Sequence, residues 1–547
     1  MPVDRIPLAG NITQRGYVPN DDTTTDQLFF GVVPDIYDNH VTGKRTIYCR
    51  KQTSWDADSA AAAGNVGRAI WSSPSTSAVV AAFGTTTSTI YSGTTNCGTL
   101  TTNHMARHIT ETVIGGVTFY LITAGSSISA TSGWFLASDA IAQTAYVGDT
   151  HSNTTVDNIA STAGMYAGQA ISGTGIPANT RIASVTSGTA ILLDTAATAT
   201  AGGVSLTKTR IAKIIDADFP TGIVGQFVEM NGFVHIATQT KIYSSYLNTL
   251  TGWTANSFLS TDRSTDDGVG LARVGELIYA FGTSLIEAFY HAGNVSGSVL
   301  ARASRSYPVG ASIDAAYGRT WVTDVSGVLA WIEMGRFATV YMMAGDAPKK
   351  ISTSAISAAL TSTTVHTISA FNAWGQKIIF ISTAAPRNFA YFVDVGLWFE
   401  LDFGSVNDAF LISSSNAAPG GSDGKVKAVA SLANTDGCTY TLSATAFTNI
   451  ASIIRSSKVD HGTGKRKFIK SIRLVGDDAS SGTVTLAKCD DDSGSFTTLG
   501  TFTLSDHDKV IWRCGSYKGG RSYRLTHSTA ANFRWEALEI EYEVGTS

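Results

Sequence analysis

A hairpin that occurs twice, roughly 44 residues apart, is the feature that most constrains how this chain can fold. Residues 233–246 comprise an apolar strand, a polar turn and a second strand, and residues 277–290 repeat that order, so that Tyr246 aligns with Tyr290. A third strand–turn–strand segment follows at 321–331. Short strands that recur every 40–50 residues or so are typical of β-propeller blades. One blade cannot bury both of its faces, so the repeat predicts blades stacked around an axis.

The composition fits an all-β chain. Hydrophobic residues make up 43% and charged residues 15% of the 547, with 53 glycines, a balance that suits strands and tight turns. So few charges are also expected where an assembly buries much of the surface; a secreted β-protein rich in Thr and Ser is the alternative. We predict a β-propeller over 46–147 and 208–410, with one helix at 350–361. About six blades are expected, with candidates at 66–95, 113–138, 226–247, 270–291, 318–346 and 377–401.

The repeat is interrupted between 148 and 207, where the chain contains no Trp or Phe. Glycines and Pro177 punctuate short alternating runs there, which indicates a small β-domain inserted in a blade loop. The sequence at 172–180, with its Gly-x-Gly-Ile-Pro turn, resembles a β-module of phage tail and capsid-decorating proteins. A long flexible loop is the alternative.

The two ends of the chain differ from the repeat. Residues 1–45 are predicted to be an extended N-terminal arm that pairs with a blade or another subunit, with a disordered leader as the alternative. Residues 411–454 are expected to hold a linker and strands, with an exposed loop at 414–424. From 455 to 547 the strands alternate apolar and polar residues, which predicts a separate C-terminal β-sandwich.

Charge and cysteine usage exclude several classes of protein. A net charge of −4 does not suit a tight phosphate binder, although a near-neutral wall could still enclose DNA. The five cysteines contain no CxxC spacing, so neither a disulfide framework nor a zinc ribbon is indicated, and reduced thiols made in a cytoplasm are expected. We find no signal peptide pattern at the start and no apolar run of about 20 residues.

Two histidines are candidates for a metal site. His104 and His108 would share one face of a helix, but the segment between them lacks the acidic residue of an HExxH motif. We therefore predict that neither binds a metal, and we expect no cofactor.

Two acidic clusters could suggest catalysis. Asp262, Asp266 and Asp267 stand near a blade start, and paired carboxylates could serve a glycosidase, but no second cluster is identifiable and a solvated loop is preferred. The acidic run at 490–496 resembles part of a calcium loop with misplaced glycine and Glu, and a hairpin turn is preferred. No nucleophile elbow, phosphate-binding loop or dinucleotide fingerprint occurs, so we predict that the protein is not an enzyme.

One basic patch is a candidate contact surface. Lys465, Arg466 and Lys467 lie together on the predicted sandwich and could meet DNA phosphates or acidic neighbours in a ring. A solvated hairpin loop is the alternative. A second basic pair is Lys349 and Lys350.

Several segments together resemble one family. They are the basic stretch 41–51, 267–290, the Ser-Tyr-Pro-Val-Gly-Ala run 306–311, 344–352, 510–515, 522–526 and 538–542. Through them the chain is similar to the tail hub or nozzle proteins of short-tailed bacteriophages, including the packaged-DNA-stabilisation proteins, over roughly 30–50, 210–410 and 455–547. The inserted stretch at 148–207 departs from the simplest members.

The resemblance implies a structural virion protein of the tail, assembled in the host cytoplasm. Six subunits would form a ring below the portal and adaptor, retain packaged DNA, provide the ejection channel and attach tail fibres or spikes. Double-stranded DNA would pass through the lumen without sequence specificity, and no catalytic residue carries over. The alternative is a propeller-bearing tail protein that recognises the host by binding or hydrolysing glycans.

Overall fold

Strands make up most of the structure. The computed structural model describes residues 2–8, 27–39, 44–73, 78–127, 129–142, 144–261, 266–294, 297–313, 319, 322–325, 327–363, 365–384, 387–403, 408–413, 426–443, 445–447, 451–478, 481–491 and 495–546. The predicted helix is confirmed within this part of the chain as α1 (Ser354–Ser362), which starts where Thr353 caps the Ile356 amide. Lys350, where the predicted helix begins, instead ends the strand β30 (Ala347–Lys350). No helical segment in the described ranges has the length and apolarity of a membrane span.

Five blades are separate four-stranded antiparallel sheets. Each runs from an inner strand at the axis to an outer strand. In chain order they are β6 (Gly67–Ser72), β7 (Val79–Phe83), β8 (Thr89–Ser92) and β9 (Thr95–Thr99); β19 (Ile223–Met230), β20 (Phe233–Thr238), β21 (Lys241–Ser245) and β22 (Trp253–Ser260); β23 (Gly268–Val274), β24 (Leu277–Gly282), β25 (Ile286–His291) and β26 (Leu300–Tyr307); β27 (Val322–Val325), β28 (Val328–Met334), β29 (Ala338–Ala344) and β30 (Ala347–Lys350); and β35 (Phe410–Ile412), β36 (Lys427–Ala430) and β37 (Thr439–Leu442) with β5 (Trp55–Ala57).

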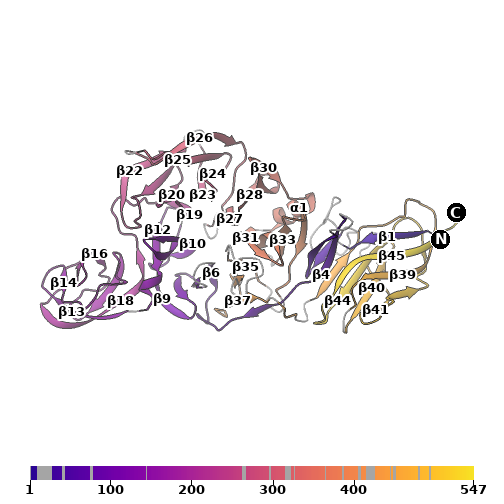
Figure 1. Cartoon of the computed structure of the whole chain (residues 1–547), viewed down its shortest axis with the longest axis horizontal. Helices are drawn as coiled ribbons and strands as arrows, with labels where there is room; N and C mark the ends of the chain where they lie inside the picture. The colour runs from indigo at the N-terminus through magenta and orange to yellow at the C-terminus, as the bar shows by residue number, and fades with distance from the viewer. Residues whose placement is uncertain are drawn as a thin grey trace.

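Two further four-stranded arrays complete the ring, each as part of a nine-stranded sheet. The innermost strands contact one another in the order β6, β10, β19, β23, β27, β31, β35 and back to β6 (Figure 1). The ring thus consists of five separate blades and two arrays that merge with neighbouring strands, so the expected count of about six blades is wrong. One of the separate blades is completed by a remote strand. These arrays are β10 (Met105–Ile114), β11 (Val117–Gly125), β12 (Thr131–Ala137) and β18 (Ala201–Lys213), and β31 (Val365–Ala373), β32 (Gln376–Thr383), β33 (Asn388–Phe392) and β34 (Leu397–Glu400).

The ring is closed by a strand from the opposite end of the chain. β5 pairs with β37 as the outer strand of the last blade. The carboxylate of Asp58, just beyond β5, accepts hydrogen bonds from Lys427 Nζ at 2.8 Å, Thr439 Oγ1 at 2.7 Å and Thr441 Oγ1 at 2.8 Å. The propeller thus extends past the predicted limit of residue 410, and the strands expected in a 411–454 linker form a blade. The loop expected at 414–424 lies outside the described residues.

Blade hairpins pack through small residues at the inner strands. The repeated hairpins are confirmed as β20–β21 and β24–β25, whose central residues Val234 and Ile278 are fully buried. Gly225 has a φ of +71°, and a Cβ built there would lie 2.6 Å from Gly270 Cα of the next blade. No larger residue fits at this approach of the two backbones.

Additional strands lie between β12 and β18 of one blade. They pair along an extension of β18 and surround their own apolar cluster, which includes Tyr146, Ile171, Ile191 and Leu206. Figure 1 shows them as a lobe at the lower left, beside the propeller. The strands are β13 (Ala145–Thr150), β14 (Thr155–Asp157), β15 (Gln169–Gly173), β16 (Ile182–Ser187) and β17 (Ala190–Leu193).

The C-terminal strands form two sheets at the other end of the molecule, where both termini lie (Figure 1). The N-terminal strands belong to these sheets: β1 and β4 pair with β45, so the predicted arm binds its own chain. The acidic stretch 21–26 and the turn at 42–43 lie outside the described residues. One sheet has β1 (Val3–Pro7), β3 (Val32–Asn39), β4 (Lys44–Lys51), β39 (Lys467–Gly476), β42 (Val510–Trp512), β43 (Ser516–Tyr517) and β45 (Arg534–Val544); the other continues from β34 through β2 (Leu28–Phe30) to β38 (Ser452–Arg455), β44 (Ser522–His527), β40 (Thr483–Cys489) and β41 (Thr497–Thr503).

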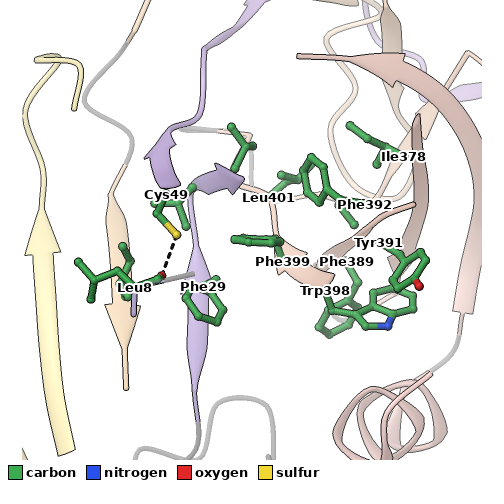
Figure 2. Packing of buried hydrophobic residues seen from close by; sticks show 14 of the residues in the cluster. Leu8, Phe29, Cys49, Ile378, Phe389, Tyr391, Phe392, Trp398, Phe399 and Leu401 are labelled. Atoms are coloured by element: carbon green, nitrogen blue, oxygen red, sulfur yellow. Dashed lines mark hydrogen bonds between the residues drawn. The ribbon is translucent and has the colours of Figure 1, made fainter. Parts of the chain in front are cut away.

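The propeller and the C-terminal sheets are joined through β2, which pairs in parallel with β34 and antiparallel with β38. Figure 2 shows the apolar core at this junction, where Phe29 of β2 packs on Phe399 of β34 with ring centroids 5.1 Å apart. Beside it, the Cys49 thiol donates a hydrogen bond to the Leu8 carbonyl at 2.8 Å (Figure 2). A shared sheet and a shared core therefore link the two parts.

Candidate functional site

The inner strands enclose a cavity of about 340 Å³ on the propeller axis. Every inner strand contributes to its lining. All of these strands run in the same direction, because each blade begins with its innermost strand, so one end of the cavity faces the strand starts and the other faces the strand ends. The charged and titratable residues of the lining are Arg68, Arg107, His108, Glu111, Glu229, Arg273 and Arg319.

Basic side chains gather near the strand starts, and β-bulges hold several of them. Arg68 of β6, Arg107 of β10 and His366 of β31 are each the residue skipped in the pairing of the inner strand with its neighbour. A bulged residue has no partner across the ladder, and a bulge redirects the side chain it carries. The same local irregularity in three blades thus brings basic residues to one end of the axis.

Hydrogen bonds order three members of this basic group. Arg319 Nη1 lies 3.1 Å from His366 Nε2, and its Nη2 donates to the Arg68 carbonyl at 2.7 Å. Arg68 Nε donates to the Gly84 carbonyl at 2.7 Å. Arg68 and Arg319 are buried, with exposed fractions of 6% and 3%. These guanidinium groups are held in fixed positions by backbone carbonyls and a histidine.

Arg107 differs from Arg68 and Arg319 in that no hydrogen bond to a described residue fixes its guanidinium group. It is 7% exposed, its buried Nε has no hydrogen-bond partner, and the described residues place no carboxylate in an ion pair with it. Burial lowers its pKa, but an arginine remains charged at neutral pH. Arg107 is therefore a buried cation without a counter-charge among the described residues.

The two glutamates of the cavity lie near the strand ends, where neighbouring side chains donate to both. Trp71 Nε1 donates to Glu111 Oε2 at 2.8 Å, and Arg273 Nη1 pairs with Glu229 Oε2 at 3.1 Å. Arg273 Nη1 also donates to the Glu229 carbonyl at 2.7 Å. Both carboxylates are thus engaged by neighbouring donors, which does not suit the paired acid and base of a glycosidase.

The histidines near the axis are neutral at neutral pH. Burial, with Arg319 and Arg107 nearby, lowers the pKa of His108 to about 3. Burial, with Arg319 and Arg68 nearby, lowers the pKa of His366 to about 2. The charge of the cavity is therefore set by its four arginines and two glutamates, which leaves an excess of positive charge.

The residues considered for metal binding are not arranged as the helical motif would require. His108 lies on β10 and His104 immediately before it, on a strand whose spacing does not place residues four apart as on a helix. His104 Nδ1 contacts Ser132 Oγ at 3.2 Å. Within the described ranges no group of three His, Cys, Asp or Glu side chains is placed to hold a metal ion.

The acidic clusters stabilise turns. Asp266 accepts from the backbone amides of Thr283, Ser284 and Leu285 at 3.0, 2.6 and 3.0 Å, so it holds the β24–β25 turn rather than standing free in a solvated loop. Asp262 lies outside the described residues. Asp490 pairs with Lys488 at 2.6 Å and its Oδ2 accepts from Arg521 Nη2 at 3.0 Å.

The predicted basic patch is only partly available to a partner. Lys465 and Arg466 are exposed. Lys467 is fully buried, where its Nζ donates to the Gly519 carbonyl at 2.7 Å and lies over the Tyr517 ring. The structure does not bring these three side chains near the axial arginines. Sequence reasoning missed that group; its one local signal is a basic residue at the start of several inner strands.

The fold defines a β-propeller protein. Residues 147–374, which include the additional strands after β12, match the family described as "Bacteriophage P22 Gp10, beta-propeller". This match confirms the resemblance to packaged-DNA-stabilisation proteins over that part of the chain and supports a structural protein of a phage tail.

The chain also matches solved structures at low sequence identity and with low TM-scores. Raptor of Chaetomium thermophilum matches at 12% identity and a TM-score of 0.37, over 72% of this chain and 29% of that protein. Sqt1 of Saccharomyces cerevisiae matches at 12% identity and a TM-score of 0.35, over 71% of this chain and 99% of that chain. The sialidase of Trypanosoma rangeli matches at 9% identity and a TM-score of 0.28, over 98% of this chain and 96% of that chain. No curated protein matches in sequence.

Proposed function

We propose that this protein is a tail hub or nozzle subunit of a short-tailed phage, which forms a hexameric ring below the portal and adaptor. The observation that carries the proposal is the family match over residues 147–374. The ring would retain packaged DNA, conduct it during ejection and attach fibres or spikes. Its place would be the virion tail, after assembly in the host cytoplasm.

The DNA conduit would lie between subunits rather than along the propeller axis. The axial cavity is about 340 Å³ and is closed in by side chains of every inner strand, so it has no room for a duplex. A ring of several propellers would instead surround a wider lumen. A near-neutral chain, with a net charge of −4, would let DNA slide without gripping its phosphates.

Exposed apolar side chains at one end of the propeller support a contact between subunits. Val113, Tyr246, Leu247 and Tyr290 are 57%, 54%, 56% and 44% exposed. They belong to three consecutive blades, and each follows or ends a first or third strand, which places all four at the end of the propeller where the inner strands finish. Clusters of this kind on a soluble surface often mark protein contacts.

Electron microscopy of the purified full chain tests the proposal directly. We expect ring-shaped particles, alone or with the neighbouring tail proteins. The double variant Tyr246→Ser with Tyr290→Ser is expected to weaken ring formation at least tenfold. The matched control is Phe337→Ser, which removes a ring that is 57% exposed at the β28–β29 turn, on the opposite end of the propeller.

The same preparation separates the proposal from the glycan alternative. A protein that remained monomeric with its neighbours and bound or cleaved a host polysaccharide would contradict the structural role. We do not propose hydrolysis, because Glu111 and Glu229 are already engaged by Trp71 and Arg273.

A further inference from the structure

The described residues that line the axial cavity carry more positive than negative charge. Four arginines and two glutamates line it. One glutamate pairs with Arg273, and the other accepts from Trp71. Placing a cation in a low-dielectric interior costs several kcal/mol, so a cation of this kind is normally matched by an anion.

Arg107 is where this imbalance is sharpest. It lines the cavity, is 7% exposed and has a buried Nε without a hydrogen-bond partner. Arg107 is the bulged residue of β10, so it has no partner in the regular strand pairing. The backbone at the bulge, and not only the side-chain conformation, sets the direction of the Arg107 side chain. The nearby Arg68 and Arg319 are fixed by backbone carbonyls, so the end of the cavity near the strand starts is already ordered.

We propose that the axial cavity binds a small tetrahedral oxyanion of the phosphate or sulfate type, held by Arg107 with Arg68 and Arg319 beside it. Guanidinium groups donate in a planar fork that matches two oxygens of such an anion. The bound anion would link β6 and β10 to Arg319, which precedes β27, at the axis. This site is separate from the proposed tail function.

Calorimetric titration of the full chain tests this inference. Inorganic phosphate is titrated in a buffer free of phosphate and sulfate, with ionic strength held constant by sodium chloride. We expect saturable binding of one phosphate per chain, sulfate binding of similar strength, and a rise in the unfolding temperature with phosphate. Absence of saturable binding would overturn the proposal, as would acetate binding as tightly as phosphate.

The variant Arg107→Gln identifies the residue. It is expected to weaken phosphate binding at least tenfold and, because it removes an unmatched buried charge, to leave the anion-free protein at least as stable as the wild type. Arg336→Gln is the matched control, since Arg336 is exposed at the β28–β29 turn. Wild-type affinity in Arg107→Gln, or an equal loss in Arg336→Gln, would refute the assignment.

A structure of the wild-type protein with selenate keeps the test independent of the variant's folding. An anomalous peak beside Arg107 is expected. A cavity with no such peak at saturating selenate would overturn the proposal.

Discussion

Replacing Gly225 with alanine is expected to force apart the inner strands of two neighbouring blades. A Cβ at this position would lie 2.6 Å from Gly270 Cα, a distance that real contacts essentially never show, and the obstacle is backbone, not a side chain that can rotate. Gly225 also has a φ of +71°, in the left-handed region that disfavours alanine.

Gly275 separates these two effects. Its φ is +60°, but a Cβ there would have nothing within 4 Å. Gly275→Ala should therefore show the backbone penalty of about 1–2 kcal/mol, reduced by the gain of about 0.4–1 kcal/mol from a stiffer unfolded chain. Gly225→Ala adds an overpacking cost of about 1–3 kcal/mol, for a total of about 1–5 kcal/mol.

The assay is urea unfolding followed by tryptophan fluorescence, with the two variants compared at matched protein concentration. We expect Gly225→Ala to be less stable than Gly275→Ala by at least about 1 kcal/mol. Equal destabilisation, within about 0.5 kcal/mol, would refute the close approach of these inner strands.

Three other variants test how the ring is held. Asp58→Ala removes the acceptor for three donors at the ring closure and should lower the free energy of unfolding in urea by about 2 kcal/mol. The control Asp346→Ala, at an exposed ion pair, should lower it by less than about 0.5 kcal/mol. Equal effects of the two variants would argue against the closure. Burial raises the pKa of Asp58, but hydrogen bonds from its three donors outweigh this and hold it below the ordinary value, so the Asp58 contribution should persist above about pH 4 and disappear as the pH falls further. Asp408→Ala, which removes the acceptor for three turn amides, should cost about 2 kcal/mol and speed proteolysis between β36 and β37; an unchanged cleavage rate would contradict the turn role. Burial lowers the pKa of His235 to about 3, so this histidine takes up a proton in the unfolded chain at a higher pH than in the folded protein. The free energy of unfolding should therefore fall as the pH drops below about 6.5, by up to about 1.4 kcal/mol per pH unit. His235→Gln should reduce that slope, and an identical slope would refute the burial of a neutral ring.

The Asp408 prediction rests on a device that occurs twice. Asp408 and Asp266 each stand two residues before an inner strand, and each accepts from three successive backbone amides in the turn between the second and third strands of its blade. From the sequence, Asp266 was expected in a solvated loop. Which amides a carboxylate meets depends on how the hairpin folds back, and that is set by the blade.

The helix at α1 and the repeated hairpins were predictable because their signals are local. Apolar residues at helical spacing and strand–turn–strand alternation can be read within about 15 residues. The blade count was not predictable in the same way. The last blade combines β35, β36 and β37 with the remote strand β5, and another blade has β13 to β17 between its third strand, β12, and its fourth strand, β18. Neither blade therefore shows four consecutive strands in one stretch of sequence.

The axial basic group was missed for a related reason. Arg68, Arg107, Arg319 and His366 are far apart in sequence, and each is an isolated basic residue in an otherwise apolar or polar segment. The basic patch that the sequence did display, Lys465 to Lys467, includes a lysine that the structure buries.

The sequence by itself determined the all-β class and the propeller, because most of a blade is a local unit and its hairpin recurs in three segments about 44 residues apart. Only the tertiary structure decided how the ring closes and what faces its axis. Closure depends on the pairing of β5 with β37, two strands that are far apart in the sequence. The axial charge depends on bulges that bring one residue from each of several blades to the same end, and no short-range pattern encodes that convergence.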